Sequence, residues 1–302
     1  MPENLLKINE KEYILPGNRA CQGCGLSLAY RIALKALREN TIMTVSASCL
    51  CVLHGLYPST PVKIPCLNSS FASSGATASG LVAGLRAMNR TDTTVVAFIG
   101  DGGTLDMGIQ SLSGAAERGT DFIYVCYDNE GYMNTGTQRS SATPLGALTT
   151  TTPIATKQQH KKDFIKIMEA HDIPYVATAS PSYPVDLYDK FVKAKKIKGT
   201  RYIHLSIPCP PGWGYPPKDT VKMGRLGVET GITPLFEVED GRFRFTGRSR
   251  SMAERGNRLP VINYLEKQSR FQKMNLEQMQ RFQRWVDGKW QEYMRRAQEG
   301  TA

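Results

Sequence analysis

The sequence has 302 residues, of which 41% are hydrophobic and 22% are charged. This composition is typical of globular proteins and excludes a disordered or fibrous chain. No apolar run approaches the roughly 18–20 residues that span a bilayer, and the N-terminal segment MPENLLKINEKEYILPG has no apolar signal-peptide core. We therefore expect a soluble, cytoplasmic protein without a membrane partner.

Positive charge is in excess: 38 lysines and arginines stand against 27 acidic residues, for a formal net charge of +11. Much of it lies in scattered runs in the second half of the chain, such as KQQHKK at 157–162 and KAKKIKG at 193–199. These runs carry no helix-turn-helix, zinc-finger or RNA-binding aromatic pattern, so specific nucleic-acid binding is not expected. A solvated or partner-facing surface is the simpler interpretation.

Helical periodicity and short apolar runs alternate through most of the chain. In chain order we predict a helix after GNRACQGCG that ends near residue 40, a strand at 41–47, a strand at 62–65, a helix within 69–88, a strand at 93–100, a helix at 107–118, a strand at 121–128, a long loop at 132–157, a helix at 161–171, a strand at 174–179, a helix at 184–198 and a strand at 201–208. Alternation of this kind predicts a doubly wound, mainly parallel α/β sheet.

The composition changes after residue 208. A helix at about 219–230 is followed by LFEVEDGRFRFTG, in which Asp240-Gly241 predicts a hairpin turn. The last segment, from residue 276, has the pattern of an amphipathic helix. We therefore predict an α/β domain at 1–208 and an extension at 209–302 that packs on its own domain or on a partner.

Glycines and oxygen-bearing side chains follow two of the predicted strands. Gly100-Asp101-Gly102-Gly103 ends the strand at 93–100, and Asn129 and Gly131 follow the next strand. Parallel strands end at the same edge of a sheet, and Mg²⁺ prefers oxygen ligands such as a carboxylate, an amide oxygen and a backbone carbonyl. The glycines let the backbone approach phosphates closely. A Gly-Asp-Gly alone would indicate only a tight turn, but both motifs together predict a metal–diphosphate site.

Seven cysteines without a secretion signal indicate metal or redox chemistry rather than disulfides. Cys21 and Cys24 lie on a loop before a helix and can be a redox dithiol, half of a zinc site or half of an iron–sulfur site. Cys49 and Cys209 follow predicted strands and can converge with the loop that carries Cys21 and Cys24. Cys51 is a rival to Cys49 as the third ligand, because spacing alone does not separate the two.

The remaining cysteines and the histidines carry no ligand pattern. Cys66 and Cys126 lie in apolar strand contexts, so we expect buried, inert thiols. The four histidines have no ligand spacing and are interpreted as structural or solvated.

Several of these segments together closely resemble the β subunit of 2-oxoacid:ferredoxin oxidoreductases, with the nearest likeness to the pyruvate synthase group. The segments are GNRACQGCG, SASC, GDGGTLDMG, DNEGYMNTGTQRSSATPLGA, the late Cys209-Pro210 and LEKQSRF. The resemblance covers nearly the whole chain and implies the thiamine diphosphate-binding fold.

The resemblance also implies cofactors and their ligands. It implies Mg²⁺ held by Asp101, Asn129 and the Gly131 carbonyl, with Asn134 near the thiazolium ring and the substrate. One [4Fe–4S] cluster would be held by four thiolates, and further residues would contact the thiamine cofactor. The implied cluster ligands are Cys21, Cys24, Cys49 and Cys209, and the implied cofactor contacts also include Ser48, Cys49, Gly100, Gly102, Gly103, Met133 and Thr135.

The implied reaction is the oxidative decarboxylation of a 2-oxoacid to acyl-CoA and CO₂, with coenzyme A as co-substrate and single-electron transfer to the cluster. In the family, the glutamate that activates thiamine comes from another subunit, and this chain has no candidate for it. The chain also lacks a two-cluster ferredoxin motif. The resemblance thus implies an alpha subunit, a gamma subunit, a ferredoxin-like two-cluster subunit and external ferredoxin as partners.

The substrate and two rival functions stay open at this stage. Pyruvate is favoured, while phenylglyoxylate, oxalate and branched-chain 2-oxoacids are alternatives handled by close relatives. A non-redox thiamine enzyme would not need the C-x-x-C motif. A zinc-binding scaffold could use Cys21, Cys24, Cys49 and Cys51, but it leaves Asp101 and Asn129 unexplained.

Overall fold

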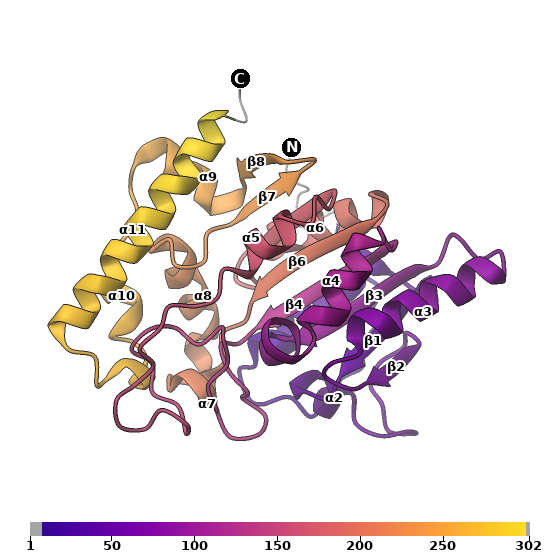
Figure 1. Cartoon of the computed structure of the whole chain (residues 1–302). Coiled ribbons are helices and arrows are strands. Elements are labelled where there is room, and N and C mark those ends of the chain that lie inside the picture. Colours follow the sequence, from indigo (N-terminus) through magenta and orange to yellow (C-terminus); the bar gives the residue numbers. More distant parts are fainter. Residues whose placement is uncertain (1–7, 300–302) are drawn as a thin grey trace.

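The computed structural model describes residues 8–299, which form a three-layer α/β structure (Figure 1). The ends of the two predicted domains, residues 1–7 and 300–302, lie outside this range. The centre is an eight-stranded sheet in the order β2-β1-β3-β4-β6-β5-β7-β8. Its strands are β1 (Thr41–Ser46), β2 (Cys66–Ser69), β3 (Thr94–Gly100), β4 (Phe122–Asp128), β5 (Tyr175–Ala179), β6 (Thr200–Ser206), β7 (Phe236–Glu239) and β8 (Arg242–Phe245).

The six strands up to β6 pair in parallel, and helices cover both faces of the sheet they form. Successive side chains of β3 alternate between two cores: Val96 and Phe98 face one, Ala97 and Ile99 the other. A strand that is buried on both faces has a continuous apolar sequence, as β3 and β4 do. One layer contains α1 (Gly25–Leu37), α2 (Cys49–His54) and α6 (Pro184–Lys196); the other contains α3 (Ser74–Ala87), α4 (Ile109–Glu117) and α5 (Phe164–Glu169).

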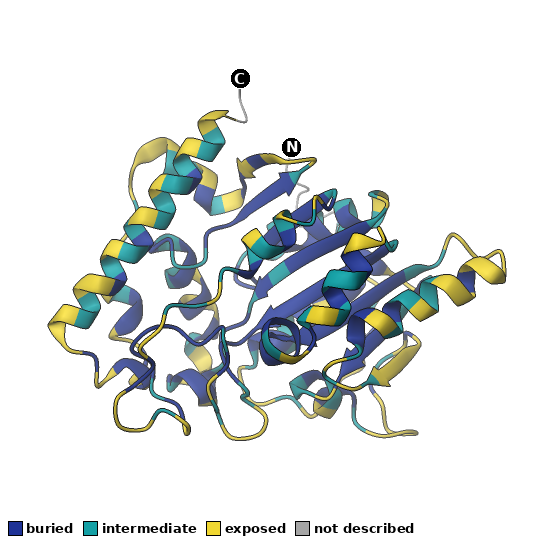
Figure 2. Cartoon of the chain, viewed as in Figure 1, coloured by how far each residue is buried: buried dark blue, intermediate teal, exposed yellow. Residues whose placement is uncertain are grey.

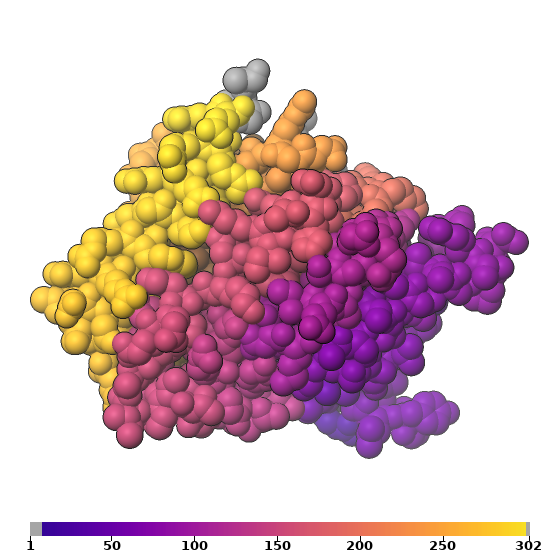
Figure 3. All heavy atoms as spheres, in the orientation of Figure 1, coloured from indigo at the N-terminus to yellow at the C-terminus, as the bar shows by residue number. Residues whose placement is uncertain are grey.

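The chain after residue 208 extends the same sheet and adds a third core. Strand β7 pairs antiparallel with β5 and with β8, so the predicted hairpin is confirmed. The helical elements here are α7 (Pro210–Trp213), η3 (Pro217–Asp219), α8 (Thr220–Glu229), α9 (Gly247–Arg255), α10 (Ile262–Leu265), η4 (Ser269–Phe271) and α11 (Leu276–Glu299). Helix α11 is amphipathic, and its Phe282 and Val286 are buried beside Leu145 of the 132–157 loop. Figure 3 shows α11, in yellow, directly against the pink atoms of that region.

The predicted parallel α/β class is therefore correct, and two local predictions are wrong. The strand predicted at 62–65 begins at Cys66 instead, because Pro61 precedes that segment and Pro65 ends it, and neither residue can donate to a ladder. The paired strand β2 is the exposed edge of the sheet (Figure 2), so Cys66 is exposed there rather than buried. Cys126, in contrast, is fully buried as expected.

The segment between β3 and the next helix is itself helical. Gly102–Met107 form a π-helical turn, η2, and α4 begins after Gly108. Within residues 8–299, no helix has both the length and the apolar character that crossing a bilayer requires.

Candidate cofactor and metal site

The two glycine-containing loops meet at one edge of the sheet. Strands β3 and β4 are neighbours with Gly100 paired to Tyr127, so Asp101 and Asn129 leave the sheet side by side. These two side chains are 1% and 5% exposed. They border a hollow of about 510 Å³ that contains every residue predicted to contact the thiamine cofactor. Its lining is Ala47, Ser48, Cys49, Phe71, Gly100, Asp101, Gly102, Gly103, Tyr127, Asn129, Gly131, Tyr132, Met133, Asn134 and Thr135.

The side-chain amide of Asn129 forms the centre of the candidate metal site. One end of this amide lies 2.9 Å from Asp101 Oδ1 and 2.9 Å from the carbonyl oxygen of Gly131. With nitrogen at that end, the amide donates two hydrogen bonds. With oxygen there, three oxygens face one another and need a cation among them. Mg²⁺ binds oxygen at roughly 2.0–2.1 Å in octahedral geometry, which separates neighbouring ligands by about 2.9 Å, so the three groups fit such an ion.

The Asp101 carboxylate is poorly compensated by the protein itself. Burial and the nearby Asp128 raise its pKa well above the usual range, and Lys161 opposes this only in part. The Ser140 hydroxyl donates a hydrogen bond to Asp101 Oδ2 at 2.5 Å. The other oxygen, Oδ1, is the one directed at the Asn129 amide. A divalent cation at that point would stabilise the charged carboxylate.

Gly102 is required for the close approach of the two loops. A Cβ atom at this position would lie 2.2 Å from the ring of Tyr132, which belongs to the second loop. The Tyr132 hydroxyl in turn donates to Asp106 Oδ2 at 2.9 Å. The glycine thus permits contact between the segments after β3 and β4.

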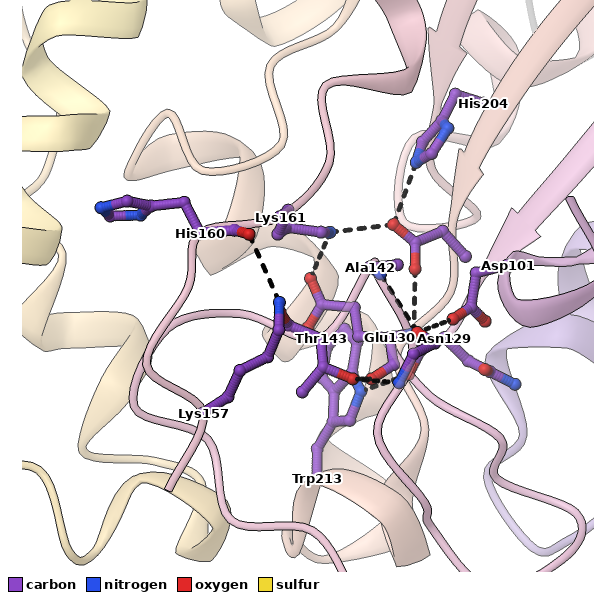
Figure 4. A network of polar contacts seen from close by, with 12 residues as sticks. Asp101, Asn129, Glu130, Ala142, Thr143, Lys157, His160, Lys161, His204 and Trp213 are labelled. Carbon is purple, nitrogen blue, oxygen red and sulfur yellow. Dashed lines mark hydrogen bonds and ion pairs between the residues drawn. The ribbon is translucent and has the colours of Figure 1, made fainter. Parts of the chain in front are cut away.

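A largely buried network of charges adjoins the candidate metal-site oxygens (Figure 4). Lys161 Nζ lies 2.8 Å from Asp128 Oδ2 and 2.7 Å from Glu130 Oε1. His204 Nε2 lies 3.0 Å from Asp128 Oδ2. Burial alone would raise the pKa of Asp128 and lower that of Lys161, but their ion pairing reverses both shifts.

Two residues of the C-terminal segment complete this network. Arg270 Nη2 lies 2.6 Å from Glu130 Oε2, and Trp213 Nε1 donates to the backbone oxygen of Asn129 at 2.8 Å. Sequence reasoning missed these residues, along with Ser140 and Lys161. LEKQSRF contains Arg270, but nothing in the spacing connects it with Glu130.

The candidate cluster cysteines form one group near the same sheet edge. Burial raises the pKa of Cys49 to about 11, and the charges of Cys24 and Cys21 add to the shift. Burial also raises the pKa of Cys209 to about 12, with further contributions from Cys49, Cys24 and Cys21. These four sulfurs are therefore electrostatic neighbours. Thiolates at such positions need bound iron or another cation to stay deprotonated.

The structure separates Cys51 from this group. Helix α2 begins at Cys49, so Cys51 is two helical residues further on. Residues at this spacing are rotated by about 200° from one another around the helix axis. Cys51 Sγ lies 3.7 Å from Asn68 Oδ1 on β2 and interacts with Cys66. Over residues 8–299, no three acidic, histidine or cysteine side chains converge enough to hold a single ion. A [4Fe–4S] cube makes a different demand, because each thiolate binds its own corner.

The metal and cysteine groups adjoin at Asn129. The end of its amide that faces away from Asp101 places Nδ2 at 3.9 Å from Cys49 Sγ. Cys49 also interacts electrostatically with Asp101. The candidate diphosphate site and the candidate cluster site are therefore neighbours in the structure.

Comparison with protein families identifies the class of this domain. The "Thiamine pyrophosphate enzyme, C-terminal TPP binding domain" family matches residues 49–205, which include β3, β4 and both glycine-containing loops.

Similar proteins narrow the class. The chain is 50% identical to "Pyruvate synthase subunit PorB" of Methanothermobacter thermautotrophicus, over 95% of this chain and 99% of the relative. It is 45% identical to the protein of that name in Methanocaldococcus jannaschii, over 94% and 97% of the two chains. It is 41% identical to "Ketoisovalerate oxidoreductase subunit VorB" of Pyrococcus furiosus, over 96% of each. The chain therefore belongs to the 2-oxoacid:ferredoxin oxidoreductase family, as a β subunit of the PorB and VorB type.

A solved structure supports the fold. The chain resembles a 2-oxoglutarate:ferredoxin oxidoreductase from Magnetococcus marinus with a TM-score of 0.57, over 70% of this chain and 72% of the other, at 23% sequence identity. That structure was determined with 2-oxoglutarate, coenzyme A and succinyl-CoA bound.

Proposed function

We propose that this chain is the subunit of a CoA-dependent 2-oxoacid:ferredoxin oxidoreductase that binds thiamine diphosphate, Mg²⁺ and one [4Fe–4S] cluster, and that its substrate is pyruvate. The observation that carries the proposal is the Asn129 amide, one end of which lies 2.9 Å from both Asp101 Oδ1 and Gly131 O, in a hollow lined by all the predicted cofactor contacts. Pyruvate is supported by relatives named pyruvate synthase at 45–50% identity.

Each part of the hollow has a distinct task in this proposal. Asp101, Asn129 and Gly131 would hold Mg²⁺, and Gly102 permits the contact with Tyr132 that brings the two segments together. Asn134 would contact the reacting end of the cofactor. When bound, thiamine diphosphate supplies the carbanion chemistry that cleaves the 2-oxoacid.

The four grouped cysteines would hold the cluster that accepts electrons one at a time. Cys49 borders the hollow and belongs to the cysteine group, so it would place the cluster directly beside the cofactor. Such closeness suits electron transfer, which needs no side-chain acid. A zinc scaffold that uses Cys51 is disfavoured, because Cys51 faces Asn68 and Cys66.

The proposed active site is incomplete in this chain alone. Among the described residues that line the hollow, Asp101 is the only acid, so none is available to activate the aminopyrimidine ring. We propose that a partner alpha subunit supplies this glutamate. Gamma and ferredoxin-like two-cluster subunits, external ferredoxin and coenzyme A complete the proposed system.

A branched-chain 2-oxoacid is the second candidate substrate, because relatives named ketoisovalerate oxidoreductase are 41% identical over 96% of the chain. The test is to purify the native complex and to measure CoA-dependent viologen reduction with pyruvate, 2-oxoisovalerate, phenylglyoxylate and oxalate. Pyruvate should give the highest kcat/KM, and the chain without partners should give no turnover. Turnover by the chain alone would contradict the proposal that a partner subunit supplies the thiamine-activating glutamate.

Cofactor analysis tests the proposal separately from substrate choice. The complex should contain iron in excess of zinc, and its visible absorption should bleach with dithionite. Acid extraction should release thiamine diphosphate. Zinc in place of iron would indicate the scaffold instead.

A further inference from the structure

The loop that presents two of the three metal-site oxygens has an unfavourable backbone conformation. Glu130 lies between Asn129 and Gly131 with φ of +69°, in the left-handed region that non-glycine residues rarely adopt. This turn brings the Asn129 amide within 2.9 Å of the Gly131 carbonyl oxygen. Such a conformation persists only where surrounding contacts hold it.

The side chain of Glu130 is held from two sides. It is 3% exposed, and its two carboxylate oxygens pair separately with Lys161 at 2.7 Å and with Arg270 at 2.6 Å. Its backbone is held as well: Asp128 Oδ1 accepts a hydrogen bond from the Glu130 N–H at 2.9 Å, and Thr143 Oγ1 donates to the Glu130 carbonyl at 2.7 Å.

Arg270 and Trp213 reach this loop together. The Arg270 guanidinium lies 4.1 Å from the centre of the Trp213 ring, and Arg270 Nε donates to Gln268 Oε1 at 2.9 Å. Trp213 Nε1 donates to the Asn129 carbonyl at 2.8 Å. One stacked pair thus contacts the loop at the Asn129 backbone and at the Glu130 side chain. A planar, stacked guanidinium suits this position better than a flexible ammonium.

We infer that Arg270, stacked on Trp213, is a positioning residue for the metal site: by pairing with Glu130 it holds the 129–131 loop in the shape that directs the Asn129 and Gly131 oxygens at the cation. The inference rests on the proposed Mg²⁺ site and adds a role for the segment after residue 208. Partners one step removed from a metal ligand typically change metal affinity by about 10–100-fold when they are replaced.

The test uses the purified hetero-oligomeric complex after chelation of its metal. Mn²⁺ is the probe: its EPR signal reports free metal during titration in the presence of thiamine diphosphate. Arg270→Met removes the charge and keeps an apolar chain over Trp213, whereas Arg270→Lys keeps the charge and loses the planar stack. We expect a dissociation constant for Mn²⁺ that is about 10-fold higher for Arg270→Met, the lower end of that range because Arg270 acts through Glu130, and a smaller rise for Arg270→Lys.

The matched control is Arg258→Met. Arg258 also pairs with an aspartate, Asp287, and also lies over a tryptophan, Trp290, at 5.8 Å, but it does not contact the 129–131 loop. This variant should bind Mn²⁺ like the parent complex. An equal loss of affinity in Arg258→Met and Arg270→Met would show a general structural effect and overturn the inference.

A double variant tests whether Arg270 acts through Glu130. Glu130→Gln combined with Arg270→Met should bind Mn²⁺ no more weakly than the weaker single variant, because both remove the same pair. Losses that multiply, or an unchanged affinity in both Arg270 variants, would refute the positioning role. A parent complex that binds no Mn²⁺ with thiamine diphosphate would refute the proposed metal site itself, so the two failures are distinguishable.

Discussion

Replacing Asp101 by asparagine should have opposite effects on the metal-free and metal-bound states. The substitution preserves shape, and the new amide can still accept the hydrogen bond that Ser140 donates to Oδ2. Its nitrogen would then take the place of Oδ1, 2.9 Å from the Asn129 amide, and would donate to the Asn129 oxygen where a cation is expected. Asp101→Asn therefore exchanges a buried, poorly compensated carboxylate for a neutral hydrogen bond.

The magnitude follows from ligand linkage. At a free Mg²⁺ concentration about 100 times the dissociation constant, binding stabilises the folded state by about 2.7 kcal/mol. Loss of one of three protein oxygens and its charge should weaken Mg²⁺ binding by at least about 100-fold. Replacing a residue that only contacts a metal ligand already weakens binding by up to about 100-fold. Binding at the same Mg²⁺ concentration would then contribute about 0.4 kcal/mol, a loss of about 2.3 kcal/mol. Without metal, burial raises the pKa of Asp101, so the neutral variant should be the more stable protein.

Calorimetric titration of the complex with Mg²⁺ and thiamine diphosphate measures the affinity, and thermal unfolding with and without Mg²⁺ measures the two stabilities. Asp106→Asn is the matched control, because Asp106 is held by Ser141 much as Asp101 is held by Ser140 but does not line the hollow. Iron content should be unchanged in both variants. Metal-dependent cofactor binding that survives in Asp101→Asn at the parent affinity would refute the assignment of Asp101 as a ligand.

Three further outcomes are expected. Cys49→Ser should lose iron and Cys51→Ser should keep it, as measured by iron analysis; the reverse would identify Cys51 as the ligand. Trp213→Phe removes the donor to the buried Asn129 carbonyl, which should destabilise the chain by about 1–3 kcal/mol and weaken Mn²⁺ binding, so a variant equal to its parent in both would contradict the contact. Burial lowers the pKa of His54 to about 4, so folding stability should fall as pH decreases from 6.5 towards 4, because the unfolded state binds the additional proton. His54→Gln should flatten that part of the profile of unfolding free energy against pH, and an unchanged profile would contradict the shift.

The fold was largely predictable because the strands are buried on both faces. The runs TVVAFIG and FIYVCYD form β3 and β4 with little shift of their ends, and the Asp240-Gly241 turn forms the hairpin. Prediction failed at β2, where an edge strand is exposed and has no apolar pattern to report its position. Ile64 of the neighbouring segment is buried without belonging to a strand. The domain division at residue 208 stays a prediction, since β7 and β8 continue the sheet of the preceding residues.

The residues of the candidate site that could be predicted are those placed by local sequence, and the missed ones come from distant segments of the chain. Asp101 and Asn129 directly follow strands and Gly131 lies two residues beyond Asn129, so all three are predictable, because parallel strands deliver their ends to one edge. The contact between Arg270 and Glu130 joins positions 140 residues apart through a loop and a short 3-10 turn, so no periodicity reports it. Cys49 and Cys51 could not be separated by spacing, because the answer depends on whether the segment is strand or helix. In α2 they are directed away from one another.

The orientation of one amide connects the metal site with the cysteines. In Asn129 one end faces Asp101 Oδ1 and Gly131 O, and the other faces Cys49 Sγ. An amide accepts through its oxygen and donates through its nitrogen. With its oxygen towards Asp101 and Gly131, Asn129 can bind a cation there, and in the same orientation its nitrogen can donate to a thiolate at Cys49. Without a cation, the hydrogen bonds to the two oxygens require the opposite orientation, which turns a carbonyl oxygen towards the sulfur. The two candidate centres are therefore mutually consistent: the orientation in which Asn129 would bind Mg²⁺ is also the one in which it would donate to Cys49 as a proposed cluster ligand.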